Sequence, residues 1–138
     1  MPSILSTAAL VLGAFLFGAS CPARASADCN RSDLDQSTQV QCITTRIKTL
    51  DGELNRTYQA ALSSMPEKSP QDLRKEREQL RKSQRAWLKY KDENCTLVGA
   101  IEGGSNLSVT HRAGLCEEKA LRERIAFLKG IADVSSRP

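Results

Sequence analysis

The sequence predicts a small all-α protein, an antiparallel bundle of about three helices held together by two disulfides. Apolar residues recur at steps of three and four, strand-like runs of Val, Ile and Thr are few, and four cysteines follow an apolar leader. The 138 residues allow one domain. Beyond residue 27, only 38 of 111 residues are hydrophobic, so the core is thin and a covalent restraint is expected.

Residues 1–27 are expected to be a signal peptide, and residues 28–138 to form the single domain. Residues 4–17 are apolar and uncharged, which suits a signal-peptide core and is short for a membrane span. Small-residue cleavage sites end at Ala25 and Ala27, and we favour the second. A lipid anchor on Cys21 is disfavoured, because no aliphatic residue stands three places before it. The mature chain should be extracytoplasmic, periplasmic or secreted, without a transmembrane span.

A first helix is predicted up to Met65. Ser32 or Asp33 could cap its start, and Pro66 ends it because the ring removes a donor and clashes with the preceding turn. Its apolar stripe is continuous and comprises Val40, Ile43, Ile47, Leu50, Leu54, Tyr58, Ala61, Leu62 and Met65.

A second helix is predicted from about Pro70 to Val98, with a narrow buried stripe of Leu73, Leu80, Trp87, Leu88 and Cys95. A turn should follow, marked by Gly99, Gly103, Gly104, Ser105 and Asn106.

A third helix is predicted to start near Ser105 or Ser108, and residues 134–138 should fray. Gly114 weakens the first half of this helix. The apolar positions are Leu115, Cys116, Leu121, Ile125, Leu128 and Ile131.

The four cysteines beyond Ala27 predict two disulfides in an oxidising compartment. Three pairings are possible. Cys95 and Cys116 flank the turn between adjacent antiparallel helices, so this bond is the easier one to form. A bond between Cys29 and Cys42 requires the segment before the first helix to double back along it. Zinc is disfavoured because no C-x-x-C pair occurs and His111 is the only histidine, and no metal or other cofactor is expected.

An ordered set of motifs resembles the N-terminal domain of the lysozyme-inhibitor LprI family, a set of small exported bacterial proteins. The similarity runs from about Cys29 to Leu128, and Lys91 stands where Arg is usual. The resemblance implies a helical extracytoplasmic module with disulfides, and lysozyme inhibition is attached to a member. The matching residues are Leu54, Asn55 and Tyr58, the run from Gln84 through Trp87 to Cys95, Gly103, Gly104 and Ser105, Cys116 and Arg124.

Structural roles are expected for the motif residues. Trp87 should anchor the core, and Asn55 and Tyr58 should hydrogen-bond and pack at a helix interface. Gln84 and Asp92 could satisfy buried backbone groups or bind Arg124. His111 is expected at the surface or in a turn.

No catalytic site is expected, because the sequence lacks a recognisable acid, base or nucleophile motif. The favoured hypothesis is a binding protein that inhibits lysozyme-type peptidoglycan hydrolases. Its candidate contacts are Asp92, Glu93, Glu102, Gly103, Gly104, Ser105, Glu117 and Glu118.

The alternative is an envelope module that binds anionic polymers or a membrane surface through a basic helix face of Arg74, Arg81, Arg85 and Lys89. Nucleic acid is disfavoured as a partner, because the chain is exported and few aromatic residues interrupt the basic run.

Overall fold

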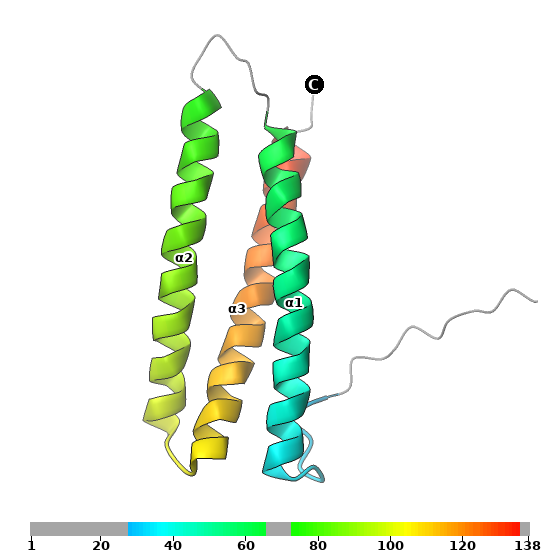
Figure 1. The fold of residues 1–138 in the computed structure, drawn as a ribbon, viewed down its shortest axis with the longest axis vertical. Helices are drawn as coiled ribbons and strands as arrows, with labels where there is room; N and C mark the ends of the chain where they lie inside the picture. Colours follow the sequence, from blue (N-terminus) through cyan, green and yellow to red (C-terminus); the bar gives the residue numbers. More distant parts are fainter. Residues whose placement is uncertain (1–27, 66–72, 136–138) are drawn as a thin grey trace, which may run out of the picture.

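Three long helices form an up-down-up bundle, which confirms the predicted all-α class (Figure 1). The structure is a computed structural model that describes residues 28–65 and 73–135. Helix α1 spans Gln36–Ser64, α2 spans Leu73–Glu102 and α3 spans Asn106–Ser135. The predicted signal peptide, Pro66 and Pro70 lie outside the described residues.

Helix α3 is the central element of the bundle. It packs against both α1 and α2, whereas α1 and α2 have few contacts with each other. The apolar core lies in the half of the bundle that holds the end of α1, the start of α2 and the end of α3 (Figure 1). Its buried members are Leu50, Leu54, Ala61, Leu62, Met65, Leu80, Leu121, Ile125 and Leu128.

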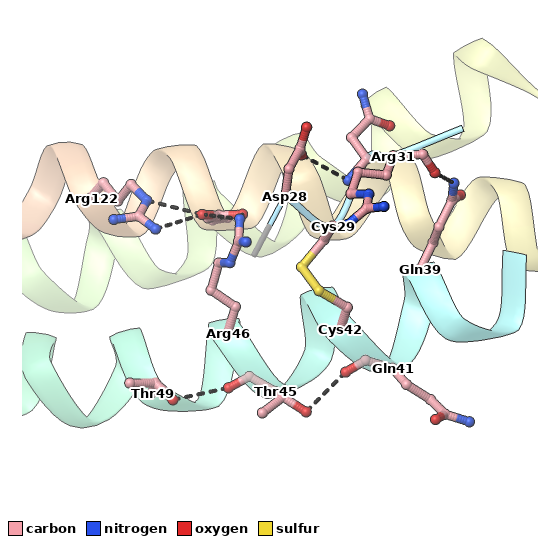
Figure 2. Close-up of a disulfide and its surroundings, with 12 residues drawn as sticks. Asp28, Cys29, Arg31, Gln39, Gln41, Cys42, Thr45, Arg46, Thr49 and Arg122 are labelled. Carbon is pink, nitrogen blue, oxygen red and sulfur yellow. Dashed lines mark hydrogen bonds and ion pairs between the residues drawn. A yellow bond between two sulfur atoms is a disulfide. The ribbon is translucent and has the colours of Figure 1, made fainter. Parts of the chain in front are cut away.

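The two disulfides lie in the opposite half, near the α2–α3 turn. Cys29 bonds to Cys42 with the Cα atoms 5.5 Å apart, and Cys95 bonds to Cys116 with the Cα atoms 5.4 Å apart. Both predicted bonds are confirmed. Figure 2 shows how the segment before α1 turns back along the helix so that Cys29 reaches Cys42. Covalent bonds therefore restrain the end of the bundle where few large apolar side chains are buried.

The predicted cap of α1 was wrong. Asp35, and not Ser32 or Asp33, caps the helix, and its Oδ1 accepts a hydrogen bond of 3.0 Å from the Thr38 amide. Ser32 and Asp33 fall in the turn that brings Cys29 back to Cys42, where the backbone is not yet helical. The Thr38 hydroxyl also donates to the other carboxylate oxygen of Asp35, at 2.5 Å, and the hydrogen bonds from this hydroxyl and from the Thr38 amide lower the pKa of the Asp35 carboxyl group.

Two helix boundaries extend beyond the prediction. Helix α2 continues past Val98 to Glu102, and α3 continues through Val134 to Ser135. The turn is short because Gly103 and Gly104 both adopt positive φ, of 65° and 103°.

Gly99 and Gly114 are packing residues inside helices. A Cβ atom on Gly99 would lie 2.8 Å from the Val109 carbonyl oxygen of α3, so the glycine lets α2 and α3 approach closely. A Cβ on Gly114 would lie 3.0 and 3.1 Å from two side-chain carbons of Ile43, which is 1% exposed. Gly99 is therefore not part of the turn, and Gly114 is what allows α1 to pack on α3.

Leu88 was predicted to be buried, and this was wrong. Its side chain is 39% exposed, because α2 buries only the narrow strip that faces α3.

We expect Gly114→Val to lower the free energy of unfolding by about 1–3 kcal/mol, because the new side chain would overlap Ile43. Gly130 is the matched control: it lies in the same helix, with open space around its Cα, so Gly130→Val should be near neutral. Urea unfolding of both variants measures the difference. Equal stability of the two would show that α1 and α3 do not pack closely at Gly114.

Replacing Cys95 and Cys116 together by Ser should lower the free energy of unfolding by about 3 kcal/mol, since the bond closes a loop of 21 residues. Urea unfolding without reductant measures this, and mass spectrometry after alkylation of the parent protein should find residues 29, 42, 95 and 116 unmodified. Alkylation of these cysteines in the folded, unreduced protein would contradict the assignment.

Candidate functional site

The turn between α2 and α3, with the residues on either side of it from Leu97 to Leu107, lies at the disulfide end of the bundle and is called the tip below. Ser105 caps α3, with its Oγ accepting a hydrogen bond of 3.2 Å from the Ser108 amide. The same hydroxyl donates to Gln36 Oε1 of α1 at 3.1 Å. The predicted contact residues Gly103, Gly104 and Ser105 thus lie together on one turn, which is hydrogen-bonded to α1 and to α3 through Ser105.

Exposed aliphatic side chains flank this tip, and sequence reasoning missed them. Leu97 is 56% exposed, Ile101 is 74% exposed and Leu107 is 44% exposed. Glu93, Leu97 and Ile101 follow one another at steps of four on α2, so they share one face. Leu97 and Ile101 stand outside the predicted apolar stripe, and this is the signal that could have identified them.

The predicted acidic contacts do not form one exposed patch. Glu118 is buried, and its carboxylate accepts two hydrogen bonds of 2.9 Å from Arg46 of α1 and two more, of 3.0 and 2.7 Å, from Arg122 of α3. Glu117 is hydrogen-bonded to Lys91. Glu102 is exposed and pairs with Arg112 across the turn. Of the five acidic candidates, Asp92, Glu93 and Glu102 are the exposed ones.

Lys91 is a buried cation that the sequence did not reveal. Its side chain is 6% exposed and contacts Glu117 of α3 and, at 2.9 Å, Asp92. Burial lowers the pKa of the ammonium group, but the hydrogen bonds that it donates to Glu117 and Asp92 outweigh this effect, and the net pKa is raised. Burial has the opposite effect on a carboxyl group, and it raises the pKa of Asp51. The positive charge of Lys91 opposes this rise, and the negative charges of Glu117 and Asp92 add to it.

Arg124 organises a second polar cluster between α2 and α3. Its Nε donates to Gln84 Oε1 at 2.9 Å, and a terminal nitrogen donates to Ser83 Oγ at 3.0 Å. The guanidinium carbon lies 5.5 Å from the centre of the Trp87 ring and 4.8 Å from that of Phe127. Burial lowers the pKa of Arg124. Of the two residues considered as its partners, Gln84 is the one that binds it, and Asp92 contacts Lys91.

The other motif residues divide into core and surface. Leu54 is buried, and Tyr58 and Trp87 pack against the core. Asn55 is exposed, so the prediction that it packs at a helix interface was wrong: it lies on the solvent side of α1. These positions, apart from Asn55, maintain the fold and offer little surface to a partner.

The basic face of α2 is partly neutralised. Arg81 and Arg85 both lie near Glu78, at 3.8 and 3.6 Å, while Lys89 is exposed. Arg74 belongs to the first turns of the same helix. Steps of four place Arg81, Arg85 and Lys89 on one side of α2.

His111 is 7% exposed, which corrects its predicted surface or turn position: it lies buried in the second turn of α3. Within residues 28–65 and 73–135, no group of three or more His, Cys, Asp or Glu side chains is arranged to hold a metal ion. No helix in these ranges is long and apolar enough to cross a membrane.

Residues 29–128 match the family model described as lysozyme inhibitor LprI. The chain belongs to the LprI family. A protein of Rhizobium meliloti (strain 1021), described as uncharacterised, is 29% identical over 112 residues, which cover 77% of this chain and 79% of that protein. No solved structure matches the chain. The matched range contains both disulfides, Lys91 and Arg124, so the family region includes the polar contacts that hold the bundle.

We expect the ion pairs of Lys91 to make stability depend on pH in the alkaline range. Its folded-state pKa lies above 10.5, so its contribution is present below about pH 10.5 and is lost as the pH rises through the folded-state pKa. Lys91→Met should remove this part of the alkaline decrease in the free energy of unfolding, while Lys89→Met, at an exposed site, should retain it. Identical pH profiles for the two variants would contradict this role.

Proposed function

We propose that this protein binds lysozyme-type glycan hydrolases and inhibits them through the tip between α2 and α3. The observation that supports this most directly is the match of residues 29–128 to the lysozyme-inhibitor LprI family. The disulfides suit an extracytoplasmic site of action, where cell-wall glycans and the enzymes that cut them meet.

The shape of the tip favours insertion into an enzyme cleft. A glycan hydrolase holds its two catalytic carboxyl groups in a groove that accepts an extended chain, so a narrow projection can obstruct it. The hydrogen bonds of the Ser105 hydroxyl to Gln36 of α1 and to the Ser108 amide of α3 fix the turn before binding. A preordered turn loses little conformational entropy on association, which favours affinity.

The chemistry of the tip is that of an interface with an apolar centre and a polar rim. Ile101, Leu97 and Leu107 supply the apolar area, and Glu93 and Glu102 lie beside it. Residues 28–138 carry 19 basic and 16 acidic side chains, a net charge of +3. Attraction to a basic lysozyme therefore has to come from local carboxylates such as Glu93, and net charge gives no long-range steering.

Residues 28–138 should inhibit at least one lysozyme in a cell-wall lysis assay. The double variant Glu93→Lys and Ile101→Lys should weaken inhibition at least about tenfold, because it removes an apolar anchor and reverses a rim charge. The matched control is Arg81→Glu with Arg85→Glu, on the basic face of the same helix, which should inhibit like the parent protein.

The proposal fails if tens of micromolar parent protein leave several lysozymes of different classes fully active. It also fails in its choice of surface if the basic-face variant loses inhibition and the tip variant does not. Salt-sensitive binding of the parent, but not of the basic-face variant, to anionic vesicles would instead support the envelope-binding alternative.

A further inference from the structure

We propose that a trough along α3 binds a neutral oligosaccharide. The trough is a concavity with a volume of about 870 Å³, and its floor runs along α3 from Ser108 to Glu123. One wall comes from the segment before α1 and the first turns of α1, through Asn30 and Gln39, and the other from α2, through Tyr90 and Asn94. The proposal does not rest on lysozyme inhibition, because it concerns a different ligand and a surface that meets the tip at Glu102.

The dimensions suit an extended ligand. Fifteen residues separate the two ends of the floor, which at 1.5 Å each gives a length of about 22 Å. The volume lies toward the upper end of the range for ligand sites, about 300–1,000 Å³. A chain of several sugar rings fits such a long, open site better than a single ring does.

The charges in the trough are already paired, which points to a neutral ligand. Glu102 pairs with Arg112, and Glu123 pairs with Lys119 at 2.8 Å. An anionic or cationic ligand would have to compete with these ion pairs.

Among the neutral amides of the trough, Gln36 and Gln39 are hydrogen-bonded within the protein. Asn30 and Asn94 are therefore the amides considered for recognition, and the Asn94 Nδ2 also lies 3.8 Å from Cys116 Sγ, to which it donates.

The neutral groups have the chemistry that sugars require. Asn30 and Asn94 carry amides that both donate and accept hydrogen bonds, as each sugar hydroxyl does. Tyr90 is 64% exposed, and its ring offers an apolar face on which the carbon-bound hydrogens of a sugar ring can pack. Leu115 and Ala120 add apolar floor between the polar groups.

His111 gives an independent indication of a missing partner. Its ring borders the trough, and its buried Nε2 has no hydrogen-bond partner among the described residues. Buried polar atoms without partners are rare in folded proteins.

Both disulfides hold the walls of the trough in place. The Cys29–Cys42 bond fixes the turned-back segment that carries Asn30, and Cys116 lines the trough while joining α3 to α2. The walls are therefore set before a ligand arrives, which reduces the entropy lost on binding.

The test is a titration of the ¹⁵N-labelled protein, expressed from the full sequence with export into an oxidising compartment. The probes are chitotetraose, cellotetraose and N-acetylglucosamine. We expect saturable shifts of the amide signals of residues along the trough, including Asn94, His111 and Lys119, with at least one tetrasaccharide, and weaker binding of the monosaccharide. Preference between the two tetrasaccharides would tell whether acetamido groups are recognised.

Tyr90→Ala should weaken tetrasaccharide binding about tenfold, and Tyr90→Phe should retain most of it, because the ring face makes the contact. Phe127→Ala removes an exposed aromatic residue outside the trough and should bind like the parent protein. Circular dichroism checks that each variant folds.

The proposal is overturned if neither tetrasaccharide shifts these signals, or if the shifts occur equally in Tyr90→Ala. It is also overturned if the trough signals respond to a lysozyme and to no saccharide, since the surface would then be part of a protein interface. Failure of the sugar titration leaves the inhibition assay unaffected, so the two proposals fail separately.

Discussion

The fold depends on the burial of α3 against two helices that hardly contact each other. A single apolar stripe on α3 is too narrow to cover the contact surfaces with both α1 and α2, so α3 packs against these helices partly through polar contacts. Glu118 binds Arg46 of α1, Glu117 binds Lys91 of α2, and Arg124 binds Gln84 of α2. Buried ions are costly unless they are paired or hydrogen-bonded. Glu118 and Glu117 each have a cation on the facing helix, and Arg124 is hydrogen-bonded to the neutral Gln84. The contacts therefore fix the register of α1 and α2 on α3 more strictly than apolar packing alone would.

The two halves of the bundle are held by different forces. One half has the core around Leu54, Leu121 and Leu128, which are at most 2% exposed. The other half has two disulfides and the close approach of Gly114 to Ile43. Loop closure by a disulfide acts on the unfolded chain and needs no apolar area, so it can restrain an end where little apolar surface is buried.

Periodicity and cysteine spacing predicted most of the fold, because they are local properties of the chain. Three helices, both disulfides and the packing of Tyr58 and Trp87 could be read in this way. The burial of Lys91 and His111 could not be predicted in this way, since a basic run and a lone histidine look solvated until the three helices are packed together. Gly114 was interpreted as a residue that weakens the helix. Its contribution to stability is the space that it leaves for the side chain of Ile43, which lies 71 positions away in the sequence. The candidate contacts were predicted at the turn between α2 and α3. The exposed side chains of Leu97 and Ile101 beside that turn were missed, although both stand outside the predicted apolar stripe of α2.

The distribution of forces also explains how the tip can carry exposed aliphatic side chains. In a thin-cored protein, an Ile as exposed as Ile101 would contribute more if it were buried, and selection for stability alone would favour a polar residue at this position. The disulfide end does not need that contribution, because Cys95–Cys116 and the Ser105 hydrogen bonds already fix the turn. Side chains there are free to serve recognition. Covalent restraint at one end of the bundle thus separates the residues that fold the protein from those that can contact another molecule.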